Sequence, residues 1–142
     1  MGEFGSNFDD SCDSVSAQIK KYSKSELSAL FTELGELQIS HIQKVGFEKG
    51  IHFRLTDEPR DKIGKRIIED FREKLYQKIC IEFDYCKKKK NFENLEILAI
   101  SGMIIPSILQ VIGNDPDSSW IPSPLLAVII AKMGLTKFCN CE

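Results

Sequence analysis

The chain has 142 residues, a formal net charge of −2 and a hydrophobic content of 42%. This length favours a single domain, and the apolar content is sufficient for a real core. A net charge so close to zero gives no general attraction to nucleic acid, so we expect no nucleic-acid partner. We expect residues 1–16 to be a cloning remnant (MGEFGS) followed by a disordered tail, and residues 17–142 to form one α-helical domain.

The first strong helical signal begins at Ser23, which is followed three residues later by a glutamate at the spacing of a capping box. Apolar residues then recur on one face and predict a helix from about Lys24 to Val45, ended by Gly46. His41 lies on this apolar stripe, where we expect a hydrogen-bonded structural histidine.

The connector that follows contains one alternating apolar stretch, Ile51 to Leu55, with the period of a strand. A single strand without a partner is not stable, so we expect an extended segment laid across the helices. Phe47 and Phe53 in this connector, together with the charged face of the next helix, are candidates for a protein-contact surface.

A long amphipathic helix is predicted from Asp57 to about Lys88. Its apolar residues recur every four positions, and its opposite face carries charges of both signs, which is typical of a helix packed on one side. We therefore predict that Phe71 and Leu75 are buried.

A cluster of basic residues ends this helix: Lys87, Lys88, Lys89 and Lys90. Positive charge there complements the carbonyl end of the helix dipole, so a solvated helix end is the simplest interpretation. The functional alternatives are a contact with an anionic lipid surface or with nucleic acid. We keep the four lysines as candidate interaction residues.

The most distinctive part of the sequence is the weakly charged stretch 95–135. No ionisable side chain occurs from Ile97 to Asn114, and a second uncharged run extends from Ser118 to Ala131. The pattern predicts two nearly all-apolar, central helices, with a kink or a break near Ile105 because Pro106 lacks a backbone N–H.

The ends of the second helix are marked by Ser123 with Pro124, which suit a helix start, and by Gly134, which suits the turn after a helix. A bilayer span needs about 20 apolar residues, and neither run meets this without interruption. We therefore predict a buried helix pair, and we keep a membrane hairpin as the alternative. The core positions expected in this pair are Ile104, Ile108 and Ile129.

Trp120 is the only tryptophan and lies between two proline-containing turns. It either caps the apolar helix pair or stands exposed as an anchor for a partner. The sequence leaves both alternatives open.

The five cysteines are odd in number and lack the pattern of a secreted scaffold. Four of them would meet if the last helix ended beside the long one, but their spacing is not that of a zinc site. We expect reduced thiols, a cytoplasmic location and no cofactor. The weak metal candidates are Cys80, Cys86, Cys139 and Cys141.

The sequence contains no activated nucleophile and no glycine-rich phosphate loop, so we predict that the protein is not an enzyme. The expected fold is all-α, a small bundle-like or orthogonal domain of four main helices. The expected function is a non-enzymatic protein–protein interaction or regulatory domain, such as an adaptor or an immunity-type module, with self-association possible. The alternative is a membrane-active protein that releases the apolar hairpin 95–135 on a signal.

Overall fold

The computed structural model describes residues 15–50 and 57–141, and all regular structure in these two ranges is helical. The predicted all-α class is therefore confirmed. The expected tail up to residue 14 and the strand-like stretch with Phe53 lie outside the described residues. A first helix occupies residues 15–23, so it already includes the last two positions assigned to the tail.

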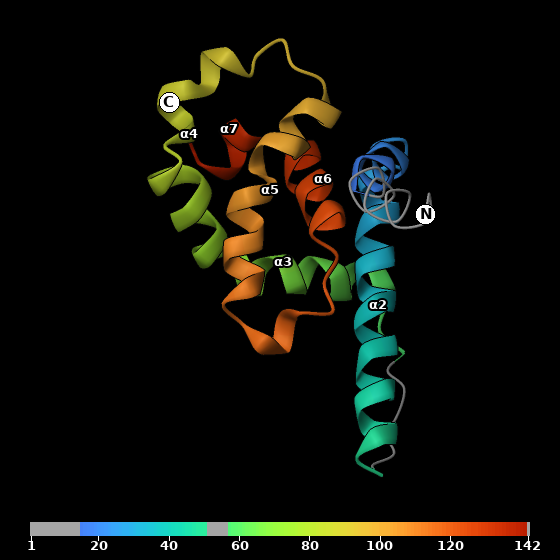
Figure 1. Ribbon diagram of the computed structural model, residues 1–142. Coiled ribbons are helices and arrows are strands. Elements are labelled where there is room, and N and C mark those ends of the chain that lie inside the picture. Colours follow the sequence, from blue (N-terminus) through green and yellow to red (C-terminus); the bar gives the residue numbers. More distant parts are fainter. Residues whose placement is uncertain (1–14, 51–56, 142) are drawn as a thin grey trace, which may run out of the picture.

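Helix α6 (Ser123–Met133) lies at the centre of the molecule (Figure 1). Eight consecutive residues, 124–131, are buried, so neighbouring elements cover every face of this helix. Ile129 is fully buried, as predicted. The helix begins at Ser123 and is followed by Gly134, whose φ of 93° is readily adopted only by glycine. The predicted ends of this helix are thus correct to within one residue.

Helix α5 (Ile97–Gly113) lies beside α6 and is buried along one face only. Ile104 and Ile108 are fully buried, as predicted, whereas much of the opposite face is exposed. The expectation that both apolar helices are central is therefore wrong for α5. The helix also continues through Pro106, so the break, one of the two predicted alternatives, does not occur. The proline is exposed, and packing of both halves of α5 on one side holds the helix together.

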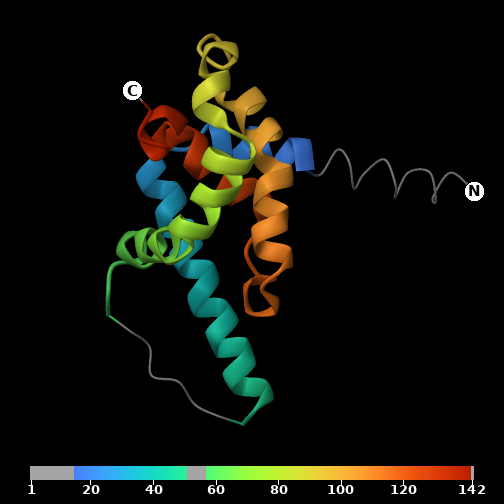
Figure 2. The ribbon, with the colours of Figure 1, turned by 90° about the vertical axis from the view of Figure 1, so that its left-hand side faces the viewer.

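Helices α2 (Leu27–Glu48) and α3 (Arg60–Tyr76) cross each other in close contact (Figures 1 and 2). The crossing point is made by two glycines. A Cβ atom on Gly35 would collide with the carbonyl oxygen of Arg60, and one on Gly64 would collide with that of Phe31. The backbones of the two helices therefore meet directly, and no side chain fits between them.

We expect Gly35→Ala and Gly64→Ala each to lower the free energy of unfolding by about 1–3 kcal/mol, because the helices must move apart to admit a methyl group. The matched control is Gly102→Ala on α5, where an added Cβ meets nothing within 4 Å. There the better helix propensity of alanine should raise stability by up to about 1 kcal/mol. Urea denaturation of the three variants checks this, and equal effects at all three positions would contradict the assigned crossing.

The predicted helix from about Lys24 to Val45 is shifted towards the C-terminus in the structure. Glu26 precedes the first turn of α2 without a side-chain cap, and Ser23 instead donates its hydroxyl proton to the carbonyl of Lys20. Gly46 does not end the helix, which continues to Glu48; Gly50, with a φ of 69°, makes the turn. The C-terminal half of α2 extends beyond the other helices in both ribbon views (Figures 1 and 2).

The helix predicted to run unbroken to Lys88 is divided in the structure. After α3 the chain forms a π-helical segment, η1 (Gln77–Glu82), and Asp84 then adopts a left-handed conformation with a φ of 60°. Helix α4 (Tyr85–Lys88) and the 3₁₀ turn η2 (Lys89–Asn91) follow in a new direction. The turn brings Tyr85 into the core, where its hydroxyl lies 3.0 Å from the Thr136 hydroxyl.

The two residues predicted to be buried in α3 differ in the structure. Leu75 is fully buried, but Phe71 is only half-buried. The prediction of burial is therefore confirmed at Leu75. It is wrong at Phe71, whose side chain turns partly outward.

No helix in residues 15–50 and 57–141 is both long and apolar enough to cross a bilayer.

Candidate interaction surfaces

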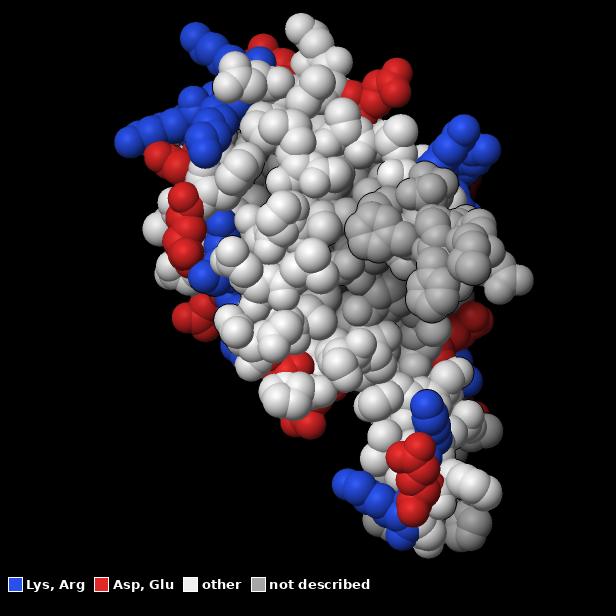
Figure 3. All heavy atoms as spheres, viewed as in Figure 1, with Lys and Arg blue, Asp and Glu red and all other residues white. Residues whose placement is uncertain are grey.

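The outer face of α5 exposes a row of apolar side chains without a charged residue among them. Leu98, Met103 and Leu109 are 42%, 45% and 51% exposed, and Leu95 precedes them at the start of the helix. Figure 3 shows an area without charged side chains over this helix. We call this surface the α5 face, and its exposed residues are Leu95, Leu98, Ala99, Gly102, Met103, Pro106, Leu109 and Gln110.

The sequence did not predict that this face is exposed. A run without charges is equally compatible with a helix that is buried on all sides and with one that is covered by a partner. The feature of the sequence that could have indicated an exposed face is the difference in composition between the two uncharged runs. The run of α5 contains Gly102, Ser107 and Gln110, whereas α6 is continuously apolar from Leu125 to Ala131.

The four candidate lysines lie in α4 and η2. Figure 3 shows Lys and Arg side chains gathered at one margin of the uncharged area. Lys87 forms an ion pair with Asp84 at 3.5 Å, and the ammonium group of Lys88 lies 4.2 Å from the centre of the Phe83 ring. Lys87, Lys88 and Lys90 are exposed. Glu93 and Glu96, which adjoin the start of α5, are exposed as well, so charges of both signs border the uncharged face on this side.

Phe47 lies near the tip of the projecting part of α2 and is 84% exposed. Ile42, one and a half turns earlier, is also exposed. The other aromatic candidate of this region, Phe53, lies outside the described residues. Phe47 thus remains a candidate contact residue, at a distance from the α5 face along a helix that projects from the body of the molecule (Figure 1).

The charged face of α3 forms ion pairs among its own residues or with nearby ones. Arg66 pairs with Glu58, and Arg72 pairs with Glu69 at 2.9 Å. Exposed pairs of this kind contribute little to stability. They do, however, leave fewer unpaired charges on this face for a partner.

Trp120 is half-buried and stacks on His41 of α2, with ring centroids 5.4 Å apart. It follows the turn η3 (Pro116–Ser118), in which Asp115 accepts hydrogen bonds from the Asp117 amide and the Ser118 hydroxyl. The tryptophan therefore links the α5–α6 connection to α2, which favours the capping alternative. His41 contributes the imidazole ring on which the indole of Trp120 stacks.

The four cysteines singled out as weak metal candidates do meet, but as two disulfides. Cys80 is bonded to Cys139, and Cys86 is bonded to Cys141. The expectation of reduced thiols is therefore wrong for these four residues, and their sulfur atoms are not available as thiolate ligands. The bridges attach the C-terminal helix α7 (Leu135–Phe138) and the residues after it to η1 and α4.

Side chains that could carry chemistry are dispersed over the described parts of the chain. No three His, Cys, Asp or Glu side chains of residues 15–50 and 57–141 are grouped so that they could hold a metal ion. The clear pKa shift belongs to Tyr22, where burial, assisted by the charge of Glu33, raises the pKa of the phenol. This tyrosine lies at the end of the first helix as part of the core.

Comparisons of this chain with protein-family models, with curated proteins and with solved structures find no match.

Proposed function

We propose that this protein is a non-enzymatic interaction domain whose main contact surface is the α5 face. The observation that carries the proposal is the row of exposed apolar side chains at Leu98, Met103 and Leu109, on a chain of which 28% is charged. Monomeric proteins rarely expose large contiguous apolar surface, and where they do it usually marks a binding site.

The surroundings of the α5 face indicate what kind of protein would bind there. The segment that leads into α5 exposes lysines at Lys87, Lys88 and Lys90 and carboxylates at Glu93 and Glu96. A matching partner would present an apolar helix or strand with charges of both signs at its rim, among them carboxylates opposite the lysines, because complementary charges at the rim steer association and fix orientation. Phe47 on the projecting end of α2 is a possible second contact.

A binding experiment tests this proposal. The full-length protein is immobilised and exposed to an extract of the cells that produce it, beside the variant Leu98→Asp/Leu109→Asp. We expect a partner that is retained by the parent protein and lost by the variant, since two carboxylates in an apolar contact remain unpaired. A second variant, Lys87→Glu/Lys90→Glu, should weaken binding mainly by slowing association.

The matched control is Glu69→Lys/Glu73→Lys on the outer face of α3, which changes charge without touching the α5 face. It should retain the partner. A partner that is lost from the control and kept by the α5 variant would place the contact on the charged helix instead. Equal retention by all variants would contradict the proposal.

The two disulfides bear on where the protein would act. The cytoplasmic location expected from the sequence rested on reduced cysteines. Disulfides persist mainly in oxidising compartments, so we propose that the protein works in such a compartment. Alkylation with a mass label before and after reduction, on protein taken directly from the producing cells, tests this. Labelling of all five cysteines before reduction would favour the cytoplasm.

A second candidate function is binding to an anionic membrane surface, and the lysines beside the α5 face favour it. The released hairpin is the weaker form of this proposal, because α6 is buried on all sides and is followed directly by the disulfide-bonded segment. Flotation with anionic liposomes distinguishes the two candidate functions. Co-flotation of the parent protein and its loss in Leu98→Asp/Leu109→Asp would favour the membrane.

A further inference from the structure

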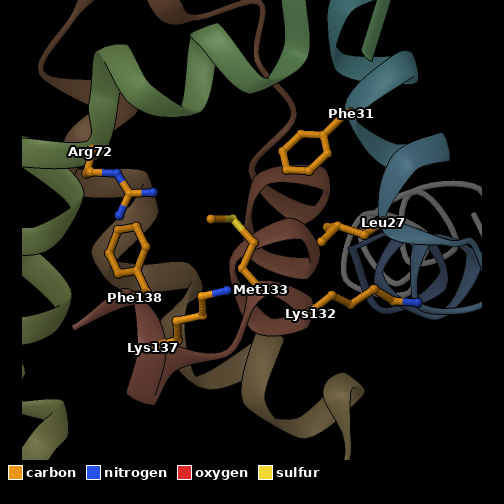
Figure 4. A pocket seen from close by; sticks show the side chains of 7 residues that line it. All are labelled: Leu27, Phe31, Arg72, Lys132, Met133, Lys137 and Phe138. Carbon is orange, nitrogen blue, oxygen red and sulfur yellow. The ribbon is translucent and has the colours of Figure 1, made fainter. Parts of the chain in front are cut away.

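A pocket of about 350 Å³ opens between α2, α3, the end of α6 and α7 (Figure 4). Its apolar walls come from Leu27 and Phe31 of α2, from Met133 at the end of α6 and from Phe138 of α7. This volume is within the range of small-molecule sites, which are mostly apolar with a few well-placed polar groups. The α5 face and its lysines contribute no residue to this pocket.

The polar groups of this pocket are all cationic: Arg72, Lys132 and Lys137. No carboxylate lines the pocket, although the chain as a whole carries a net charge of −2. Glu69 lies just outside and accepts hydrogen bonds of 2.9–3.1 Å from Nε and Nη2 of Arg72. This pair compensates one of the three charges and leaves the Nη1 group of Arg72 for a ligand. The pocket is therefore a local centre of positive charge on a slightly acidic protein.

The three cations have different surroundings. Lys132 donates a hydrogen bond to the carbonyl of Ser25, and Figure 4 shows its amine pointing away from Met133. The Arg72 guanidinium lies 5.2 Å from the centre of the Phe138 ring. The amine of Lys137 extends towards Met133 from the opposite side (Figure 4). Arg72 and Lys137 thus flank the opening between Phe138 and Met133.

Two structural features hold this arrangement in place. Phe138 is buried, and the next residue, Cys139, is bonded to Cys80. The disulfide fixes α7 and with it the position of both Lys137 and Phe138. A pocket that is already formed loses less conformational entropy when a ligand binds, which favours affinity.

We propose that this pocket binds a small amphiphilic carboxylate, with its apolar body against Phe31, Met133 and Phe138 and its carboxylate at Lys137 and Arg72. A carboxylate suits these cations because a guanidinium and an ammonium group both form short, charge-assisted hydrogen bonds with it. An apolar body is needed because four of the seven lining residues have no polar group.

The probe is sodium decanoate, titrated below its micelle concentration into the full-length protein. Methyl NMR of labelled methionine is the readout, because the chain has only three methionines. Met133 lines the pocket, whereas Met103 lies on the α5 face. We expect a saturable shift of the Met133 signal while the Met103 signal stays unchanged. Saturable shifts of Met103 alone would overturn the proposal, since the probe would then be bound to the exposed apolar face.

Two further probes separate the contributions of charge and tail. Decyltrimethylammonium has a similar tail with the opposite charge, and acetate has the charge without the tail. Both should bind at least tenfold more weakly than decanoate. Equal binding of the cationic probe would overturn the assigned role of the lysine and arginine, and equal binding of acetate would overturn that of the apolar walls.

The test by mutation uses Lys137→Gln. Because Lys137 is exposed, we expect this replacement to leave the fold intact. We expect affinity for decanoate to fall about fivefold to tenfold, because one charge-assisted hydrogen bond is lost. The control is Lys62→Gln, which removes the same charge from the exposed side of α3 and should leave the affinity unchanged. Equal affinity of the parent and Lys137→Gln would contradict the proposal. The outcome is independent of whether the α5 face binds a protein.

Discussion

Removal of both disulfides is expected to lower the free energy of unfolding by about 6–7 kcal/mol, which is comparable to the whole stability of many domains of this size. The bridges connect residues 59 and 55 positions apart in the sequence. In the chain-entropy model one such bridge contributes about 4 kcal/mol, and the second contributes about 2–3 kcal/mol because it closes a much shorter loop once the first exists.

The same argument predicts that the two bridges are partly redundant. Cys80→Ala/Cys139→Ala and Cys86→Ala/Cys141→Ala should each cost only about 2–3 kcal/mol, less than half the effect of losing both. Guanidinium denaturation of the three proteins, with and without reductant, measures this. Cys12→Ala, which changes the fifth cysteine, is the control and should leave stability unchanged. Unaltered stability of the parent protein in reductant would contradict the disulfide pairing.

The substitution Ile108→Asp is expected to unfold the protein. Ile108 is fully buried between α5 and its neighbours. Truncation of a buried isoleucine costs about 2–5 kcal/mol, and a buried unpaired carboxylate costs several more, so the sum approaches the total stability of a domain. Circular dichroism and thermal melting of the purified variant check this result.

The next residue supplies the matched control. Leu109 also lies in the middle of α5 but is 51% exposed. Leu109→Asp introduces the same side chain at nearly the same place in the helix, and stability should change by only about 0.5 kcal/mol. If both variants unfold, then the outer side of α5 is covered in the native protein. If neither unfolds, the core assigned to α5 is wrong.

Much of the helical pattern is readable from the sequence because backbone chemistry marks the ends of elements. The last long helix begins at Ser123, as expected from the adjacent Pro124, and it ends before Gly134, as expected from the conformational freedom of glycine. The first long helix was misplaced by three residues at each end. Such errors are normal, since terminal turns depend on caps and contacts that are not local in sequence.

The apolar spacing alone did not predict the break in the long helix. The strict repeat of four is nevertheless a poor match to a continuous α-helix. Residues placed every four positions drift by about 40° per step around an α-helix, because a turn takes 3.6 residues. In the structure Phe71 turns partly outward, whereas Leu75 before η1 and Ile79 within it are both fully buried. A strict repeat of four over many turns is better satisfied by an α-helix with a π-helical segment than by one continuous α-helix.

The disulfides and the pocket depend on contacts between distant parts of the chain. Nothing local to Cys80 or Cys139 indicates their pairing, which follows only from the position of α7 beside η1. In the same way, Arg72 and Lys137 lie far apart in the sequence but line one pocket. The exposed α5 face was missed for a different reason: absence of charge specifies an apolar surrounding but does not distinguish the protein's own core from a partner.

Site-specific photocrosslinking tests the central claim, that the α5 face is a contact surface, most directly. A photoreactive amino acid replaces Met103 at the centre of the face in one protein and Glu73 on the charged side of α3 in another. Both proteins are expressed in the cells that naturally produce the chain and are irradiated there. We expect one discrete protein adduct from position 103 and none from position 73. Equal, diffuse labelling from both positions, or an adduct at position 73 alone, would contradict the account.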